Sequence, residues 1–297
     1  MQHQKIAIFG RVFNTSISPF IEQLFEYFQN KGIEIVIHQE FYEYLNSTLG
    51  NKLSLETFES HADLPKNIDF LLSLGGDGTM LAAVSLVRDS GIPIAGINFG
   101  RLGFLANIPK DKIEKALDQI VSKDYTIQKR ALLSVESNQK ELFGKDNFAL
   151  NDITVFRFDS SSMITIDAQI DGELLNSYWA DGLIIATPTG STAYSLSCGG
   201  PIIMPGSGNF VITPISPHNL NVRPIVVSAD MTLKLKIESR SEKFILSCDS
   251  KSETLTTDIE LTIRKAPFEI NLIRLPNDSY FGTLREKLLW GIDVRNY

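Results

Sequence analysis

The hydrophobic pattern of this 297-residue chain changes its period near residue 130, and this change constrains the fold more than any other feature. Before it, short apolar runs alternate with helical patterns, as in strands joined by crossover helices in a mostly parallel sheet. The expected strands are 5–9, 33–37, 70–74 and 92–97, while the stretch 39–67 shows no clear period. After it, apolar and polar residues alternate at 164–170, 231–237 and 259–263, which predicts two packed antiparallel sheets.

The change of period divides the chain into three segments. Residues 1–125 are expected to form a Rossmann-like α/β domain with a mostly parallel sheet, and residues 126–277 an all-β domain. Residues 278–297 hold a helix with apolar residues on one face, namely Phe281, Leu284, Leu288 and Leu289. An amphipathic helix must bury such a face, so we expect it to return to the first domain.

Local signals set the ends of several elements. Ser18 and Pro19 predict the start of the first helix, and Gly32 predicts its end. The dipeptide Asp171-Gly172 between alternating runs predicts a two-residue hairpin turn.

Composition excludes several classes of partner. The 35 acidic and 28 basic residues leave a net charge of −7, whereas nucleic acid binding needs a basic surface. No apolar run approaches the ~18–20 residues that span a bilayer, and the N-terminus lacks the apolar core of a signal peptide. Cys198 and Cys248 are too few for a disulfide scaffold. We therefore expect a cytoplasmic protein that binds neither nucleic acid nor membrane.

The most informative motif is Gly75-Gly76-Asp77-Gly78-Thr79, between an expected strand and an expected helix at 79–90. Its glycines permit positive φ and leave backbone N–H groups uncovered, which suits phosphate binding beside a helix N-terminus. Asp77 is unexpected there, because a carboxylate repels phosphate. Two tasks fit it: accepting a proton from an attacking hydroxyl, or holding Mg²⁺ beside the phosphates. The plain alternative is an Asp-Gly turn that caps the helix.

Other phosphate and metal motifs are missing from the sequence. There is no Walker motif, and the turn at Gly10-Arg11-Val12-Phe13 lacks the glycine fingerprint of dinucleotide-binding dehydrogenases. The four histidines and two cysteines show no zinc-type spacing.

A second motif runs from Asp181 to Pro201, where an apolar strand enters a loop rich in Ser, Thr, Gly and Pro. Hydroxyl groups bind ligand hydroxyls or phosphates without adding charge, and Tyr194 can stack on a base. A hydroxyl-rich turn of a β domain is the alternative interpretation.

Together these segments resemble the signature stretches of NAD kinases, which use ATP to phosphorylate the 2′-hydroxyl of the adenosine ribose of NAD. The resemblance rests on residues 75–79, Asn151-Asp152 and 181–201, and residues 187–194 are its most specific part. It continues in the family's order through 100–104, 217–220, 223–224 and 280–284. The Gly-Gly-Asp-Gly core alone is less specific, because lipid kinases and phosphofructokinases share it.

The resemblance implies a bacterial-type NAD kinase whose α/β domain binds phosphate and whose β domain binds NAD. Asp77 would be the proton acceptor, and Gly75, Gly76, Gly78 and Thr79 would bind phosphates. The implied NAD contacts are Asp77, Gly78, Phe104, Asn151, Asp152, Asp181, Thr189, Thr192, Ala193, Tyr194, Ser195, Leu196 and Ser197.

Two positions depart from the family pattern. Asn151-Asp152 replaces the common Asn-Glu pair, which keeps the charge but shortens its reach. Lys251 follows Cys248-Asp249-Ser250 where Gln is usual, so a cation stands where the family has an amide. Further candidate site residues are Arg130, His218, Asp249 and Lys251.

The implied partners are NAD and ATP, with Mg²⁺ or another divalent metal accompanying ATP, and the metal ligands stay unassigned. The resemblance also implies a homodimer or homotetramer. Two other functions remain open on the residues alone: a lipid or sugar kinase that shares the Gly-Gly-Asp-Gly turn, and an NAD(H)-binding sensor without catalysis.

Overall fold

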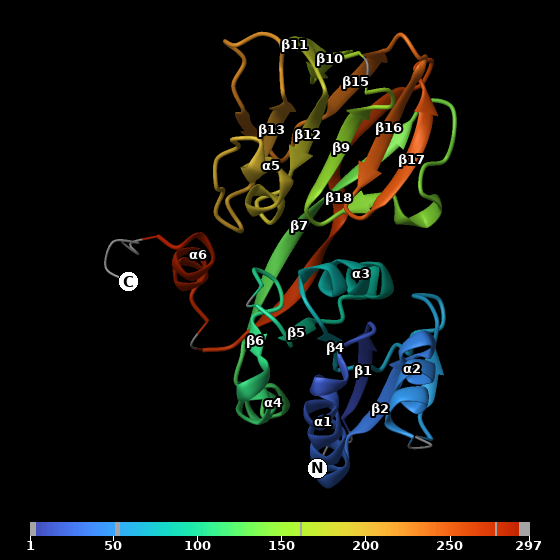
Figure 1. Cartoon of the computed structure of the whole chain (residues 1–297), viewed down its shortest axis with the longest axis vertical. Coiled ribbons are helices and arrows are strands. Elements are labelled where there is room, and N and C mark those ends of the chain that lie inside the picture. Colours follow the sequence, from blue (N-terminus) through green and yellow to red (C-terminus); the bar gives the residue numbers. More distant parts are fainter. Residues whose placement is uncertain (1–3, 51–53, 102, 161, 277, 291–297) are drawn as a thin grey trace. The chain divides into compact units, whose positions relative to one another are not determined.

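The computed structural model describes residues 4–50, 54–101, 103–160, 162–276 and 278–290 (Figure 1). It forms two compact units: unit 1 comprises Met1–Gln128 with Ile270–Tyr297, and unit 2 comprises Lys129–Glu269. Leu102 of the 100–104 motif and the last part of the expected C-terminal helix, 291–297, lie outside the described residues. No helix in the described part of the chain is both long and apolar enough to cross a membrane.

Unit 1 is built on a parallel sheet, as the sequence predicts. Its strands follow the order β5-β4-β1-β2-β3, with the short β6 beside β5. The bounds are β1 Lys5–Gly10, β2 Glu34–His38, β3 Glu56–Phe58, β4 Phe70–Leu74, β5 Ile94–Asn98 and β6 Ile108–Pro109.

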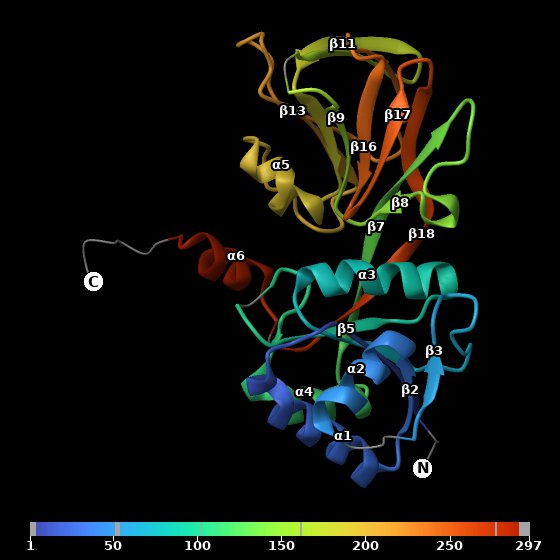
Figure 2. The same ribbon diagram turned by 45° about the vertical axis from the view of Figure 1, so that its right-hand side comes forward.

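The helices of unit 1 cover both faces of this sheet (Figure 2). The α-helices are α1 Ser18–Lys31, α2 Gln39–Leu49, α3 Asp77–Val87, α4 Ile113–Val121 and α6 Tyr280–Leu288. Ile6 and Ile8 of β1 pack into one core with buried residues of α1, α2 and α4, while α3 lies against the opposite face. The unit is therefore a three-layer α/β structure.

The predicted helix ends agree with the structure in part. The α1 helix begins at Ser18, as predicted, and a 3-10 turn at Thr15–Ile17 precedes it, where the Asn14 side chain accepts a 3.0 Å hydrogen bond from the Ser16 amide. Gly32 ends α1 with φ 66°, as predicted. The α6 helix buries Leu284, but Phe281 and Leu289 are exposed, so the predicted apolar face is only partly covered.

Unit 2 contains two antiparallel sheets that share one core, as predicted. One sheet has the order β14-β13-β12-β9-β16-β17, and the other pairs β11-β10-β15-β18. Val155 and Ile185 of the first sheet pack into the same cluster as Ile166 and Leu235 of the second. The bounds are β9 Asp152–Arg157, β10 Ile164–Ile170, β11 Glu173–Ala180, β12 Gly182–Ala186, β13 Asn209–Ile215, β14 Ile225–Ser228, β15 Leu233–Glu238, β16 Lys243–Cys248, β17 Lys251–Thr256 and β18 Glu260–Arg274.

The remaining elements are short or join the units along the chain. They are β7 Thr126–Ser137 and β8 Phe148–Ala149, the 3-10 turns Arg88–Ser90, Lys110–Lys112, Gly144–Asp146 and Gly190–Thr192, and the single helical turn α5 Tyr194–Ser197. The long strands β7 and β18 each have residues in both units. The hairpin predicted at Asp171-Gly172 is confirmed, since both residues have positive φ (51° and 89°) and Ile170 pairs with Glu173.

A close approach in β5 gives the first testable prediction. A Cβ added at Gly96 would lie 2.7 Å from Met80 Sδ and 2.8 Å from the Ala106 Cα, whereas one at Gly100 would be 3.7 Å from the nearest atom. Gly96→Ala should therefore lower the free energy of unfolding by about 1–3 kcal/mol through overpacking. Gly100→Ala, the matched control, should change it by less than ~0.5 kcal/mol. Urea unfolding followed by circular dichroism measures both, and equal effects would contradict the packing explanation.

Candidate active site

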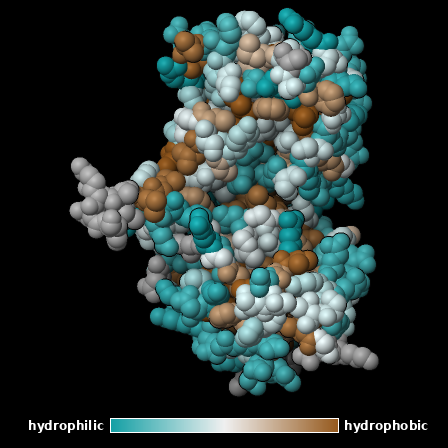
Figure 3. Space-filling view, in the orientation of Figure 1, coloured by the Kyte–Doolittle hydropathy of each residue, from teal (hydrophilic) through white to brown (hydrophobic). Residues whose placement is uncertain are grey.

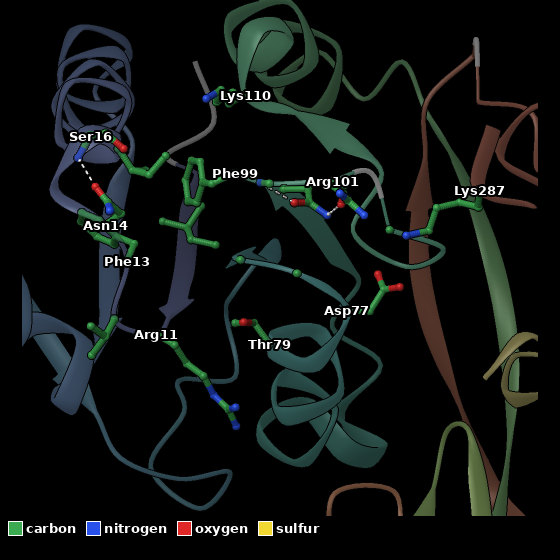
Figure 4. A pocket seen from close by; sticks show the side chains of 18 residues that line it. Arg11, Phe13, Asn14, Ser16, Asp77, Thr79, Phe99, Arg101, Lys110 and Lys287 are labelled. Carbon is green, nitrogen blue, oxygen red and sulfur yellow. Dashed lines mark hydrogen bonds between the residues drawn. The ribbon is translucent and has the colours of Figure 1, made fainter. Parts of the chain in front are cut away.

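The carboxyl ends of β1, β4 and β5 place three loops at one edge of the unit 1 sheet. After β1 the chain continues to β2 on one side, and after β4 it continues to β5 on the other, so β1 and β4 form a topological switch point. A pocket of about 750 Å³ opens there. The residues that line it come from these loops, from the 3-10 turn at 110–112 and from α6. Figure 4 labels Arg11, Phe13, Asn14, Ser16, Asp77, Thr79, Phe99, Arg101, Lys110 and Lys287 among them.

Asp77, the first residue of α3, is held by three consecutive backbone amides. Its Oδ2 accepts from the Phe104 N–H at 2.9 Å, and its Oδ1 accepts from Leu105 and Ala106 at 3.0 Å each. The side chain is half-buried and also lines the pocket. The carboxylate thus has a fixed orientation while it remains accessible from the pocket.

The loop that holds Asp77 depends on two neighbours. A Cβ at Gly103 would lie 2.0 Å from Asp77 Oδ1, so only glycine permits this approach. The buried Asn98 shapes the same loop, since its Nδ2 donates to the Arg101 carbonyl at 2.8 Å and its Oδ1 accepts from the Gly100 amide at 2.8 Å. The family stretch 100–104 therefore has a structural explanation.

The glycine turn presents its backbone toward solvent. Thr79 and Met80 donate their amides to the Gly76 carbonyl, while the amides of Asp77 and Gly78 lie in the first helical turn, where a helix offers no internal acceptor. No atom comes within 4 Å of a Cβ built on Gly76 or Gly78. Of the three glycines in this turn, Gly75 alone has a positive φ (152°), because the chain enters α3 directly after Gly76.

Sequence reasoning missed the cations of this pocket. Exposed side chains of Arg11, Arg101, Lys110 and Lys287 line it. Lys287 also lies over the half-buried Phe104 ring, with Nζ 5.8 Å from the centroid. One signal was available: Arg11 directly follows the glycine that ends β1, which is where ligands bind in parallel sheets.

Arg274 adds a cation behind the same loop. Its Nε donates to Gln128 Oε1 at 2.9 Å, and its guanidinium reaches the Phe104 carbonyl at 3.5 Å. Burial lowers the pKa of Arg274, and the carboxylates of Asp278 and Asp77 oppose this effect. Arg274 therefore lies within electrostatic reach of Asp77.

In unit 2, Asp249 holds the Asn151-Asp152 segment in the way that Asp77 holds its own loop. Its carboxylate accepts from the amides of Leu150, Asn151 and Asp152 at 2.8, 2.8 and 3.1 Å. Asp249 has φ 50° in the turn between β16 and β17, and its own amide donates to the Asp152 carbonyl. The structure therefore brings together two segments that are about a hundred residues apart in sequence.

The two carboxyl groups influence each other. Burial raises the pKa of Asp152 to about 6, with a further contribution from the charge of Asp249 and an opposing hydrogen bond from Thr154. Burial also raises the pKa of Asp249, while its three amide bonds and Lys251 oppose that rise. Asp152 is therefore the group of this pair whose charge changes in the mildly acidic range.

Some side chains of the hydroxyl-rich loop, the Ser- and Thr-rich part of the 181–201 motif, are buried. Ser195 is fully buried and its Oγ lies 2.8 Å from Thr213 Oγ1, while Thr189 accepts from Arg130 at 3.2 Å. Thr192 donates to the Thr189 carbonyl, and Ala193 and Leu196 are half-buried. Tyr194 and Ser197 are exposed and therefore accessible to a ligand.

Electrostatic effects link this loop to the carboxylates of unit 2. Burial raises the pKa of Tyr194, and Cys198, Asp152 and Asp181 contribute in that order. Asp181 also forms an ion pair with Arg157, with Nε and Oδ1 3.0 Å apart. The structure thus places Asp152, Asp181 and Tyr194 in one neighbourhood.

Two further candidates have partners within unit 2. His218 is exposed and its ring lies 4.2 Å from the Trp179 ring, centroid to centroid. Lys251 donates to Asp146 Oδ2 at 2.8 Å. The interaction of Lys251 with Asp146 gives this departure from the family pattern a structural role.

Metal-binding side chains do not gather in the part of the chain that the structure describes. No three His, Cys, Asp or Glu side chains there form a group that would hold a metal ion. Of the described residues that line the pocket, Asp77 is the single carboxylate.

Comparison with known proteins covers both units. The ATP-NAD kinase N-terminal domain matches residues 6–125, and the ATP-NAD kinase C-terminal domain matches residues 150–275. An NAD kinase of Flavobacterium psychrophilum is 51% identical over 98% of this chain and 100% of its own length. An NAD kinase of Cytophaga hutchinsonii is 47% identical over 98% and 99% of the two chains.

Solved structures agree with these relatives. A yeast NADH kinase complexed with NADH matches with a TM-score of 0.86 and 26% identity, over 99% of this chain and 90% of its own. An NAD kinase from Archaeoglobus fulgidus in complex with ATP matches with a TM-score of 0.73 and 26% identity, over 96% and 99%. With both of its domains matched in order and relatives similar over nearly its full length, the chain belongs to the ATP-NAD kinase family.

Proposed function

We propose that this chain transfers the γ-phosphoryl group of ATP to the 2′-hydroxyl of the adenosine ribose of NAD, producing NADP. One observation carries the proposal: Asp77 is fixed by three amides in a pocket lined by four cations, within a chain that matches both NAD kinase domains. The matched structures were solved with NADH and with ATP, and these ligands fit the same reaction.

Unit 1 is proposed to hold the phosphates of ATP. The amides of Asp77 and Gly78 point out of the first turn of α3, and Gly75, Gly76 and Thr79 shape the turn below them. Arg11, Arg101, Lys110 and Lys287 surround the pocket and neutralise phosphate charge. Phosphoryl transfer proceeds mainly through such positioning and charge neutralisation.

Asp77 is proposed to orient the acceptor hydroxyl and to take its proton. A carboxylate offers about four acceptor positions, and three are filled by the amides of residues 104–106. The remaining position is available to the 2′-hydroxyl. The amides prevent rotation of the Asp77 carboxyl group, so its free acceptor position points in a fixed direction and orients the 2′-hydroxyl that binds there.

A divalent metal fits this pocket when ATP supplies most of its ligands. Asp77 is the single carboxylate among the described residues that line the pocket, and its free acceptor position is assigned to the hydroxyl, so phosphate oxygens and water would hold the ion beside Asp77. Such an ion would supply neutralisation of phosphate charge during transfer.

Unit 2 is proposed to contact NAD. Asn151 and Asp152 would bind the ribose and adenine, and Asp181 would bind the nicotinamide or adenine side. Tyr194 and Ser197 are the exposed members of the hydroxyl-rich loop, and the effects of Asp152 and Asp181 on Tyr194 support a common pocket. Phe104 of unit 1 would pack on the adenine.

We further propose a cytoplasmic homodimer or homotetramer. Exposed large apolar side chains support self-association, and hydrophobic patches are visible among hydrophilic residues in Figure 3. The exposed large apolar side chains include Leu174, Trp179, Leu220, Val226, Phe281 and Leu289. Both cysteines are free thiols, which suits a reducing compartment. The comparisons give no support to a lipid or sugar kinase.

The direct test of the proposal is product formation. The purified chain incubated with ATP, Mg²⁺ and NAD should form NADP, detected by an NADP-specific dehydrogenase. Parallel reactions with NADH, diacylglycerol and simple sugars define the acceptor. NAD binding without NADP formation would instead favour the sensor interpretation.

The Asp77→Asn variant tests the proton acceptor. The amide cannot take the hydroxyl proton, so kcat should fall by at least ~10², while the KM for NAD changes only a few-fold. Asp89→Asn, an exposed carboxylate of the same unit, is the matched control and should keep normal kcat. Near-normal turnover of Asp77→Asn would exclude the proposed role.

Asp152 predicts a pH dependence of NAD binding. Its ionised carboxylate accepts a ribose hydroxyl, and its pKa is raised to about 6, so affinity is lost as pH falls through 6. Between pH 7.5 and pH 5 the Kd for NAD should rise about 10-fold. Asp152→Asn should bind more weakly but without this dependence, whereas the exposed control Asp230→Asn should retain it. Titration by calorimetry measures each Kd, and an unchanged pH dependence in Asp152→Asn would disprove the assignment.

A further inference from the structure

The loop that holds Asp77 is itself contacted by the C-terminal part of unit 1. A guanidinium nitrogen of Arg274, the last residue of β18, lies 3.5 Å from the Phe104 carbonyl oxygen. The Nζ of Lys287 on α6 lies 5.8 Å from the centroid of the Phe104 ring. The chain after residue 270 therefore meets Phe104 at two points, its carbonyl and its ring.

One peptide group connects Arg274 with Asp77. The Phe104 carbonyl oxygen and the Leu105 N–H belong to the same planar peptide unit and lie at its opposite ends. The oxygen faces the Arg274 guanidinium, and the N–H donates to Asp77 Oδ1 at 3.0 Å. A cation at the oxygen polarises the peptide group and makes its N–H a stronger donor. The cation and the carboxylate thus act on the two ends of one dipole.

The guanidinium of Arg274 is held in place on its other side. Its Nε donates to Gln128 Oε1 at 2.9 Å, so one planar group binds two acceptors at once. Both acceptors are uncharged, and neither neutralises the guanidinium. A lysine would carry the same charge as a single nitrogen on a flexible chain, without the fork that reaches both acceptors.

Electrostatic attraction acts along the same line. Burial lowers the pKa of Arg274, and the carboxylates of Asp278 and Asp77 oppose this effect. An arginine remains protonated in proteins, so the charge is permanent. Arg274 is half-buried, and water screens its charge less than it screens a charge on the surface. The attraction therefore favours the arrangement in which the loop lies between Arg274 and Asp77.

Other contacts hold the loop at its ends. The Asn98 side chain binds the Gly100 amide and the Arg101 carbonyl, and the Gly103 amide donates to the Ala106 carbonyl at 3.0 Å. Arg274 acts between these ends, at Phe104. The Phe104 amide donates to Asp77 while its carbonyl faces Arg274, so this residue lies between the two charges.

We propose that Arg274 is a positioning residue for phosphoryl transfer: through the Phe104–Leu105 peptide group it fixes the loop that orients the Asp77 carboxylate toward the acceptor hydroxyl. The inference rests on the proposed function, in which Asp77 orients that hydroxyl. Arg274 acts through Asp77 rather than through a substrate. Its loss should therefore slow the chemical step more than it weakens the binding of NAD or ATP.

The first experiment measures this difference. Arg274→Met keeps an unbranched apolar stem but removes the guanidinium, and its kcat should fall by about 10–100-fold, as small misplacements of a reacting group do. The KM values for NAD and ATP should stay within about 3-fold, because neither substrate loses a contact. Arg264→Met, which changes an exposed arginine of the same strand, is the matched control and should keep normal kcat. A normal kcat in Arg274→Met would overturn the proposal.

A double variant distinguishes positioning from a general loss of structure. Once Asp77→Asn has removed the proton acceptor, adding Arg274→Met should lower kcat by less than about 2-fold, because residues that act as a unit are not additive. A structural defect would instead multiply the two losses, and that result would overturn the proposal. Should Arg274→Met fail to fold, Arg274→Lys provides the same test: its kcat should fall about 5-fold alone, but not in the Asp77→Asn background.

Amide hydrogen exchange tests the loop without a catalytic readout. The Leu105 and Ala106 amides are protected by their hydrogen bonds to Asp77, so a loosened loop in Arg274→Met should speed their exchange by at least ~10-fold. The buried β1 amides of residues 6–8 should exchange as in the wild type, which shows that unit 1 stays folded. Mass spectrometry of the peptides that cover these segments gives both rates. Unchanged exchange in the loop would overturn the proposal.

These measurements separate the positioning role from the proposed function. If the chain forms no NADP but loop exchange responds to Arg274→Met as expected, the proposed function fails and the link between Arg274 and the Asp77 loop stands. If NADP forms normally while Arg274→Met changes neither kcat nor loop exchange, the positioning role fails and the function stands.

Discussion

The three amide hydrogen bonds to Asp77 are the constraint on which the unit 1 site depends. They join the first residue of α3 to the loop after β5, two segments that strand pairing alone does not fix. Hydrogen bonds to a charged group contribute about 1.5–3 kcal/mol each, so together they hold the loop firmly. The contact requires Gly103, whose missing Cβ leaves room for the carboxylate oxygen. One arrangement therefore fixes the glycine turn, the loop and the direction of the Asp77 carboxylate.

Unit 2 contains a second carboxylate that accepts hydrogen bonds from three consecutive backbone amides. This carboxylate is Asp249, and burial raises its pKa. Asp77 and Asp249 are both half-buried, but Asp77 also lines a pocket. The same hydrogen-bond arrangement thus positions a neighbouring segment in unit 2 and a carboxylate at the edge of a pocket in unit 1. The position beside a pocket, rather than the number of bonds or the burial, distinguishes the two.

The sequence predicts the features that depend on neighbouring residues. Buried runs, the end of α1 at Gly32 and the turn at Asp171-Gly172 follow from local chemistry. The sequence did not predict the α2 helix. Its buried residues are Phe41 and Leu45, which are too few to establish a helical period of hydrophobic residues. Features of the site that arise from tertiary packing could not be predicted from the sequence either. Arg11, Lys110 and Lys287 converge from separate elements, and the Ser195 hydroxyl is bonded to Thr213, which no spacing in the sequence indicates.

The net charge of the chain differs in sign from the charge around the pocket. A net charge of −7 argues against a general affinity for polyanions, yet the described residues that line the Asp77 pocket include four cations and one carboxylate, a local balance of +3. Charge on the rest of the surface is screened beyond a Debye length of about 8 Å, so a small nucleotide responds mainly to the pocket. A long nucleic acid would also meet the acidic surface around it. The positive charge of the pocket is therefore compatible with a small anionic ligand although the chain as a whole is acidic.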